Sequence, residues 1–362
     1  MIRFVVQRLL QALPVLWGVI SLIFILFQVI PGDPARMAMG QRTDSASLEL
    51  IRADLGTNLP IGVRYLKYLN DLSPVSYHNC VSLESLCYLD SSLYTPFIRL
   101  ASFSNNGVLI LKYPYLRRSY QSRSNVSLMI KKTLPNTVVL ATVAILFASF
   151  WGILLGLLAS LAKNSFIDRF ILFFTALGIS LPSFFAAILI GWLLAFLLGD
   201  ITGLNLTGNL FEISDTGDGV KLVLKNIILP AFTLGIRPLS VIVQMMRGAM
   251  LDVMSEDYIR TARAKGLSRS RIIMVHAFRN ALNPVITSVS NWFASMLAGV
   301  VFVEYIFGWK GLGNLLVEAL NNYDLPVVMG VVLTIASLFV LMNIFTDLAY
   351  MWADPRIRLK QS

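Results

Sequence analysis

The residues best suited to ionic chemistry lie in one basic segment, Tyr258–Leu267. Arg260, Arg263 and Lys265 place three positive side chains within six residues there. Such side chains offer charge-assisted hydrogen bonds to acidic groups. An ordinary basic loop that lies against lipid headgroups would have the same composition. The order of the residues, and not their composition, decides what such a segment does.

Residues for bond-making chemistry are sparse. Cys80 and Cys87 are the only cysteines, and the two histidines, His78 and His276, are far apart in the sequence. This inventory provides neither a structural zinc site nor a metalloprotease helix. No Gly-Lys dipeptide occurs, so the chain has no phosphate-binding loop of its own. We therefore predict a protein that is no enzyme and binds no cofactor directly.

Three residues within apolar stretches are candidates for a functional path. Arg237 lies ten residues after Ile227 in an apolar run. An arginine in mid-bilayer is costly, so it is expected to face a cavity or the bundle interior, or to pair with backbone carbonyls near a kink at Pro238. Pro182 is a candidate hinge. Glu304 is expected to be a solvated helix end.

The elements that must position these residues are membrane helices. Hydrophobic residues make up 56% of the chain and charged residues 14%, with a mean hydropathy of +0.70. These values exclude an ordinary soluble globule. Six apolar runs are each long enough to cross a bilayer as a helix. They are Leu9–Ile30, Leu134–Ala162, Phe170–Leu198, Ile227–Met246, Val285–Phe307 and Pro326–Met351. The first ends in a turn with no A-x-A cleavage pattern, so we expect a retained helix rather than a signal peptide.

The charge distribution orients these helices. Lysine and arginine concentrate in the short second and fourth connections and at both ends of the chain, which places these parts in the cytoplasm. The net charge of +10 is explained in this way, without nucleic acid as a partner. The resulting fold class is an all-α integral membrane protein with six transmembrane helices. An external subdomain lies between the first two helices, and a cytoplasmic loop joins helices 4 and 5.

The predicted domains follow from this topology. Residues 1–30 form the cytoplasmic N-terminus and first helix, 31–133 the external subdomain, 134–351 the membrane core, and 352–362 a cytoplasmic tail. Leu48–Leu72 has apolar residues at helical spacing, interrupted by Gly56 and Pro60, which predicts short helices joined by a turn. In an external compartment, Cys80 and Cys87 could either form a local disulfide or remain free thiols.

The cytoplasmic loop between helices 4 and 5, residues 252–282, has the pattern of two short helices. Ser255 is expected to cap the first, which has Glu256 and Asp257 in its first turn and Lys265 in its last. Gly266 follows where a left-handed residue commonly ends a helix. Ser268 is expected to cap the second helix, near Arg269, and Pro284 to kink or restart the following span.

The residue order in this loop resembles the conserved cytoplasmic loop of ABC importer permeases of the dipeptide, oligopeptide and nickel branch. Ala262 and Gly266 keep the family register, whereas Arg260 and Thr261 replace its Glu-Ala pair, as is usual in that branch. Further similarity covers nearly the whole chain except about residues 73–113, an insertion. It is carried by Arg8–Val19, Pro31–Pro34, Leu134–Thr137, Val303-Glu304, Gly311–Gly313, Tyr323–Val327 and Asp354–Ile357.

The resemblance implies a multi-pass permease of the bacterial inner membrane with both termini in the cytoplasm. Its expected partners are a second permease subunit, two ATP-binding subunits that carry ATP and Mg, and an extracytoplasmic solute-binding protein. The loop would be the coupling helix that docks on an ATPase subunit. Close packing there is expected from Ala262, Ala264 and Gly266, and polar contacts from Arg260, Arg263 and Lys265, with Thr261 between them. Arg237 would then attract a peptide carboxylate, and Glu304 would serve as a gate or packing residue.

Alternatives remain from within and outside this class. A nickel or nickel-chelate importer shares all of the motifs above. A stand-alone channel or secondary carrier would leave the coupling-loop pattern unexplained. An intramembrane hydrolase would need paired catalytic groups within the spans, and the sequence contains no His, Asp or Glu pair there.

Overall fold

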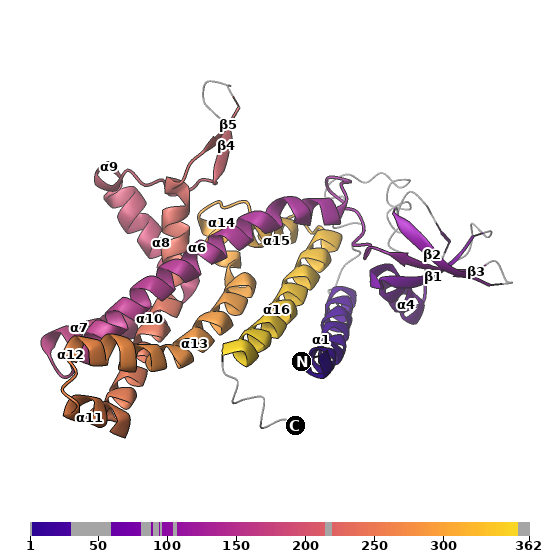
Figure 1. Ribbon diagram of the computed structural model, residues 1–362. Helices are drawn as coiled ribbons and strands as arrows, with labels where there is room; N and C mark the ends of the chain where they lie inside the picture. Colours follow the sequence, from indigo (N-terminus) through magenta and orange to yellow (C-terminus); the bar gives the residue numbers. More distant parts are fainter. Residues whose placement is uncertain are drawn as a thin grey trace. The chain divides into compact units, whose positions relative to one another are not determined.

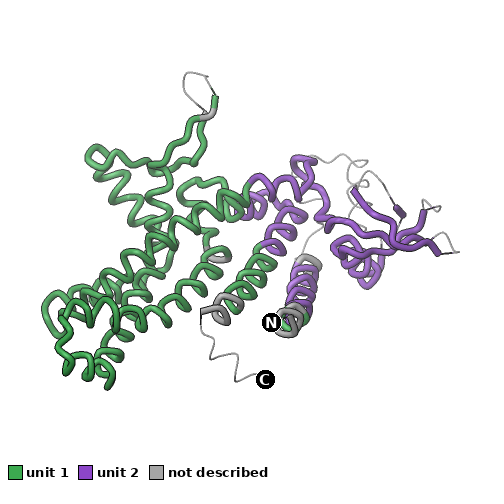
Figure 2. Tube along the Cα trace, in the orientation of Figure 1, with its two compact units in different colours: residues 1–10, 133–314, 335–362 green, residues 11–132, 315–334 purple. Residues whose placement is uncertain are grey.

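The structure is a computed structural model that describes residues 2–29, 59–80, 88–89, 94, 96–103, 107–213 and 219–353. Contacts between residues divide the chain into two compact units, which are coloured separately in Figure 2. Unit 1 consists of residues 1–10, 133–314 and 335–362, and unit 2 of residues 11–132 and 315–334.

Helices form most of the described chain (Figure 1). They are α1 (Ile2–Val29), α4 (Ile61–Leu72), α6 (Val126–Leu161), α7 (Phe166–Ser180), α8 (Ser183–Ile190), α9 (Gly199–Thr202), α10 (Lys225–Ser255), α11 (Asp257–Ala264), α12 (Arg269–Arg271), α13 (Phe278–Gly299), α14 (Val301–Ile306), α15 (Leu312–Asn321) and α16 (Leu325–Ala353). π-Helical segments at Gly191–Leu197 and Ile272–Ala277 follow α8 and α12.

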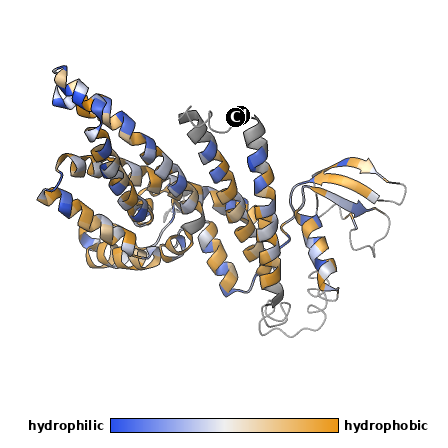
Figure 3. Cartoon of the chain, turned by 90° about the horizontal axis from the view of Figure 1, so that it is seen from below, coloured by the Kyte–Doolittle hydropathy of each residue, from blue (hydrophilic) through white to orange (hydrophobic). Residues whose placement is uncertain are grey.

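Several of these helices suit a bilayer by length and composition. Val126–Leu161, Lys225–Ser255 and Leu325–Asp347 are long and apolar enough to cross one. α7 and Ser183–Leu197 qualify as a pair that is bent by 112°, and α1 contains a shorter apolar stretch, Leu10–Leu26. Apolar residues dominate the long helices (Figure 3). The chain therefore has the helices of an integral membrane protein, and the number of six spans stays a prediction.

The boundaries of three predicted spans need correction. The helix expected from Leu134 begins at Val126 and continues through Pro135. The span expected over Phe170–Leu198 is broken between α7 and α8, because Pro182 has no N–H to donate and cannot continue α7. The span expected over Val285–Phe307 is divided into α13 and α14 after Gly299, a weak helix former.

α10 is the central helix of unit 1. It packs against α7, α8, α13 and α14. In its most apolar stretch of 18 residues, 61% is buried, compared with 33% in the corresponding stretch of α6. Glycines allow α6 to approach it closely, because a Cβ at Gly152 or Gly156 would lie 2.7 Å from Ile242 or Met246 of α10. The outer faces of α6 and α7 expose large apolar side chains, as lipid permits. Among them are Leu146, Phe150, Trp151, Phe170, Phe173 and Phe174.

Unit 2 contains a three-stranded antiparallel sheet within the predicted insertion. Its strands are β1 (Val75–Asn79), β2 (Phe97–Ser102) and β3 (Gly107–Lys112), in the order β1-β3-β2. A two-stranded hairpin, β4 (Phe211–Ile213) with β5 (Val220–Leu222), lies in unit 1. The fold class is therefore mostly helical, and the prediction of an all-α chain was wrong. The strands were not predicted because segments of only three to six residues give a much weaker hydrophobic pattern than the long apolar spans.

A buried ionic cluster joins α4 to this sheet. The Tyr94 hydroxyl donates to Asp71 Oδ1 at 2.8 Å, and Arg117 lies 3.7 Å from Asp71 Oδ2. Lys112 Nζ donates to the Asp71 carbonyl oxygen at 2.5 Å. Burial lowers the pKa of Lys112 to about 8, against the opposing effect of the Asp71 charge, and burial raises the pKa of Tyr68 to about 12. The expected helix before Pro60, from Leu48 to residue 58, lies outside the described residues.

Candidate functional site

The basic segment forms a short helix, α11, directly after α10. Glu256 occupies the N-cap position in extended conformation, with Asp257 in the first turn and Arg263 in the last. The prediction that Ser255 caps this helix was wrong, because Ser255 is the last residue of α10 and its hydroxyl donates to the Asp252 carbonyl at 2.7 Å. Ser268 precedes α12 as predicted, although its side chain makes no capping hydrogen bond.

Gly266 ends α11 in the left-handed conformation, with φ +77°. The Gly266 N–H donates to the Arg263 carbonyl at 2.9 Å, and the Leu267 N–H donates to the Ala262 carbonyl at 3.3 Å. These two bonds are the pair that defines a Schellman motif. Leu267 also packs against the cluster that contains Ala262, which is the hydrophobic contact expected of the motif. The predicted conformation of Gly266 is confirmed.

The two faces of α11 differ in chemistry. Ile259 and Ala262 are 0% and 7% exposed and pack in a cluster with Met250, Ile273 and other residues of unit 1. Ala262 therefore packs against its own chain, whereas it was expected to pack against a partner. The outer face is exposed and carries Arg260, Thr261, Arg263, Ala264 and Lys265. α11 thus has one apolar face that packs against unit 1 and one basic face that is exposed.

A hydrogen bond that sequence reasoning missed ties α11 to α13. Asn280 Nδ2 donates to the Tyr258 hydroxyl at 2.8 Å and to the His276 carbonyl at 3.1 Å. Asn280 lies in the first turn of α13, just after the π-helical segment. No local pattern indicates a pairing over 22 residues. α11 is therefore held by α10 through its apolar face and by α13 through this bond.

Arg237 lies at a cavity in unit 1, as one of the two sequence interpretations predicted. The cavity has a volume of about 150 Å³ and lies between the α7–α8 break, α10 and α13. Arg237 is exposed, and within the described residues no ion pair or hydrogen bond involves its guanidinium group. The alternative, in which backbone carbonyls near Pro238 hold the side chain, is not the arrangement seen here.

Pro182 lies beside the same cavity. It is the N-cap residue of α8, and its neighbours Leu181 and Ser183 both line the cavity. The structure therefore brings the helix break at Pro182 and the charge of Arg237 together, although they are 55 positions apart in the sequence. That Pro182 acts as a moving hinge stays a prediction.

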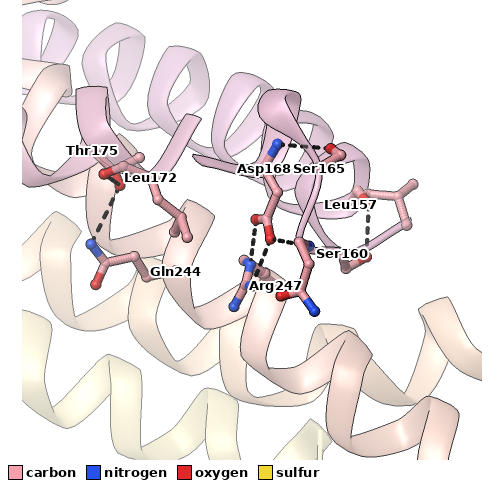
Figure 4. Close-up of polar contacts among 9 residues, drawn as sticks. Leu157, Ser160, Ser165, Asp168, Leu172, Thr175, Gln244 and Arg247 are labelled. Carbon is pink, nitrogen blue, oxygen red and sulfur yellow. Dashed lines mark hydrogen bonds and ion pairs between the residues drawn. The ribbon is translucent and has the colours of Figure 1, made fainter. Parts of the chain in front are cut away.

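A buried ion pair, which the sequence did not predict, joins the start of α7 to α10 (Figure 4). Arg247 Nε and Nη2 donate to Asp168 Oδ1 and Oδ2 at 2.7 Å and 2.8 Å. The Asn164 N–H also donates to Asp168, and the Asp168 N–H donates to the N-cap residue Ser165. The Asp168 side chain is 2% exposed and the Arg247 side chain 21%. The pair fixes the end of α10 that leads into α11.

Glu304 is a packing residue rather than a solvated helix end. It is fully buried, and its Oε2 accepts the N–H groups of Gly313 at 2.6 Å and Asn314 at 3.3 Å. It therefore stabilises the start of α15, where free N–H groups and the helix dipole favour a carboxylate. The glycines opposite have little space, since a Cβ at Gly311 would overlap the Glu304 carboxylate. Glu304 does not line the cavity at Arg237.

We predict that Gly311→Ala destabilises the protein by about 1–3 kcal/mol, because the added methyl group overlaps the Glu304 carboxylate. Glu304→Ala removes that obstacle, so the double variant should lose less stability than the sum of the two single variants. Thermal unfolding in detergent measures these effects. Gly313→Ala is the control, because its Cβ would overlap Val301 Cα and lie 3.0 Å from Glu304 Oε2, so removal of the carboxylate leaves the closer contact in place. The prediction would be contradicted if the double variant Gly311→Ala/Glu304→Ala lost as much stability as the two single variants together.

The disulfide predicted between Cys80 and Cys87 cannot be followed in the structure. Cys80 is half-buried at the end of β1, and Cys87 lies outside the described residues. The pairing stays a prediction.

Comparison with known proteins gives the relatives of this chain. The model of the family described as binding-protein-dependent transport system inner membrane component matches residues 152–359, and the model of the family's N-terminal region matches residues 1–91. A di/tripeptide transport system permease protein of Pseudomonas aeruginosa is 33% identical over 374 residues, covering 99% of each chain. A dipeptide transport system permease protein of Escherichia coli is 34% identical over 380 residues, covering all of both chains. A putative peptide transport system permease protein of Brucella abortus is 34% identical over 358 residues, covering 99% of each.

Proposed function

The chain belongs to the family of inner-membrane components of binding-protein-dependent transport systems, and on this basis we propose that it is one of two permease subunits of an ATP-driven peptide importer. The observation that carries the proposal is similarity over the full chain length to permeases named for dipeptide and di/tripeptide transport. Its partners would be a second permease, two ATP-binding subunits that hold ATP and Mg, and an extracytoplasmic solute-binding protein. A nickel importer is not favoured by these relatives.

The coupling of ATP hydrolysis to transport is assigned to α11. Its outer face offers Arg260, Arg263 and Lys265 to acidic groups of an ATP-binding subunit. Its inner face is packed into unit 1, so a force on α11 is transmitted to the helices that it contacts. Thr261, Ala264 and Gly266 complete the proposed docking surface.

The proposed topology has six spans with both termini in the cytoplasm, and α11 on the same side. The basic short connections support this orientation through the positive-inside rule. Residues 31–133, which include the sheet of unit 2, then lie outside, where the solute-binding protein delivers the substrate. Arg237 and the break at Pro182 belong to the translocation path in this proposal. Glu304 is assigned a supporting role, since it is buried against α15.

Reconstitution of the complete complex in liposomes tests the proposal. Uptake of trialanine is expected to require ATP, the solute-binding protein and this chain together. Uptake of a nickel chelate alone would overturn the substrate assignment. Uptake without ATP-binding subunits would overturn the importer assignment in favour of a channel or secondary carrier.

A further inference from the structure

The cavity at Arg237 has the features of an anion-binding site. Its volume of about 150 Å³ is roughly ten times the ~10–15 Å³ that one water molecule requires. Of the described residues that line it, Arg237 is the one charged residue, and the other polar side chains are Ser183, Thr233, Trp292 and Ser295. A positive cavity without an acidic side chain is unsuited to a cation and favours a ligand with negative charge.

Thr233 provides an independent indication of a ligand. It is 3% exposed, lines the cavity, and its hydroxyl oxygen has no hydrogen-bond partner among the described residues. Several other helical hydroxyls donate to the carbonyl four residues earlier, as those of Thr142, Ser180 and Ser240 do. Ser149 of α6 also has a buried hydroxyl without a partner in the described chain, but it does not line this cavity. A buried hydroxyl without a partner loses free energy, which a bound acceptor would restore. Thr233 and Arg237 are four residues apart on α10 and so share one face of that helix.

The first turn of α8 adds backbone donors. α8 begins at Ser183 beside the cavity, and its N-cap residue, Pro182, makes no side-chain capping hydrogen bond. The first N–H groups of a helix lack acceptors within the helix, and the helix dipole favours an anion near them. In broken membrane helices, such half-helix N-termini commonly face anionic substrate groups.

We propose that this cavity is a carboxylate-binding site, in which Arg237, the Thr233 hydroxyl and the first turn of α8 hold the C-terminal carboxylate of a peptide. The assignment of a peptide rests on the proposed function, whereas the preference for an anion rests on the cavity alone. Arg237 offers a planar pair of donors that fits the two oxygens of a carboxylate. The helix break at Pro182 creates both the space and the backbone donors of the site.

Chemical modification of the reconstituted complex tests the preference for anions without reliance on transport. Ser295→Cys places a thiol in the cavity wall, in a background in which Cys80 and Cys87 are replaced by serine. Reaction rates with an anionic sulfonatoethyl and a cationic trimethylammonioethyl methanethiosulfonate are normalised to those of a free thiol. The anionic reagent is expected to react roughly tenfold faster. A tenfold ratio corresponds to about 1.4 kcal/mol, which is close to the contribution of one hydrogen bond to a charged group.

Arg237→Gln should abolish this preference and Thr233→Val should reduce it. Lys163→Gln is the matched control, because it removes one positive charge from an exposed position between α6 and α7. The complex should assemble with Arg237→Gln, because the side chain is exposed and no ion pair in the described chain depends on it. A preference that persists in Arg237→Gln, or a thiol that reacts with neither reagent, would overturn the site.

The peptide assignment has a separate readout. Trialanine should slow the modification of the cavity thiol, and its C-terminal amide should not, because the amide lacks the negative charge. Arg237→Gln should lower trialanine uptake several-fold, with Arg237→Lys closer to the parent, because lysine keeps the charge without the planar donor pair. If the anion preference depends on Arg237 but trialanine neither protects the thiol nor enters the liposomes, the anion site stands and the peptide function fails.

Discussion

Gly266→Val is expected to leave the chain at normal abundance in the membrane while it severely reduces both peptide uptake and substrate-stimulated ATP hydrolysis. Gly266 has φ +77°, a conformation that costs a residue with a side chain roughly 1–2 kcal/mol, and more when the side chain is β-branched. A Cβ at this position meets nothing within 4 Å, so the effect comes from the backbone and not from a steric overlap. The strain should open the Schellman motif and redirect the chain after α11.

The defect should stay local because α11 is a short helix at the end of α10, whereas the membrane helices draw their stability from lipid burial and helix packing. Uptake and ATP hydrolysis are measured in liposomes that contain the complete complex. Gly266→Asn is the milder comparison, because asparagine tolerates the left-handed region better than other residues. Gly248→Ala is the matched control in α10, where an added Cβ likewise meets nothing within 4 Å and the helix favours alanine. Near-normal uptake with Gly266→Val would show that α11 is not the coupling element.

Asp168→Ala is expected to destabilise the protein by about 3 kcal/mol, because it leaves Arg247 without its carboxylate in a largely buried position. This value is the lower end for a broken buried pair, since the Arg247 side chain keeps 21% exposure to solvent. The substitution also removes the acceptor of the Asn164 N–H at the start of α7. Thermal unfolding of the purified chain in detergent provides the measurement.

A double-mutant cycle isolates the pair from its surroundings. Asp168→Ala and Arg247→Ala together should cost clearly less than the sum of the two single variants, because the double variant leaves no unpaired charge. Thr175→Val is the matched control on the same two helices, because Gln244 donates to Thr175 over a long 3.4 Å and is expected to contribute less than about 1 kcal/mol. Equal losses for Asp168→Ala and Thr175→Val would contradict the importance assigned to the ion pair.

The amino-acid sequence by itself determined the class of protein and the position of the basic helix α11. Apolar runs long enough for a bilayer predicted a chain rich in membrane helices, because a helix satisfies its own backbone hydrogen bonds in lipid. Gly266 was predicted as a left-handed helix end because local residue order controls helix termini. The family also followed from the sequence, since its motifs are short and lie in known register along the chain.

The tertiary structure alone decided which residues from distant parts of the sequence contact one another. Asp168 and Arg247 are 79 positions apart, and Arg237 meets the break at Pro182 only because α7, α8, α10 and α13 pack together. Periodicity reports which face of a helix is apolar, but it does not tell which partner that face contacts. For the same reason the residue types alone placed Glu304 at a solvated helix end, and only the family resemblance offered a gate or packing role. In the structure the Glu304 side chain is buried beside Gly311 and Gly313 at the start of α15. Pairings of this kind depend on long-range packing, which no local pattern of residues encodes.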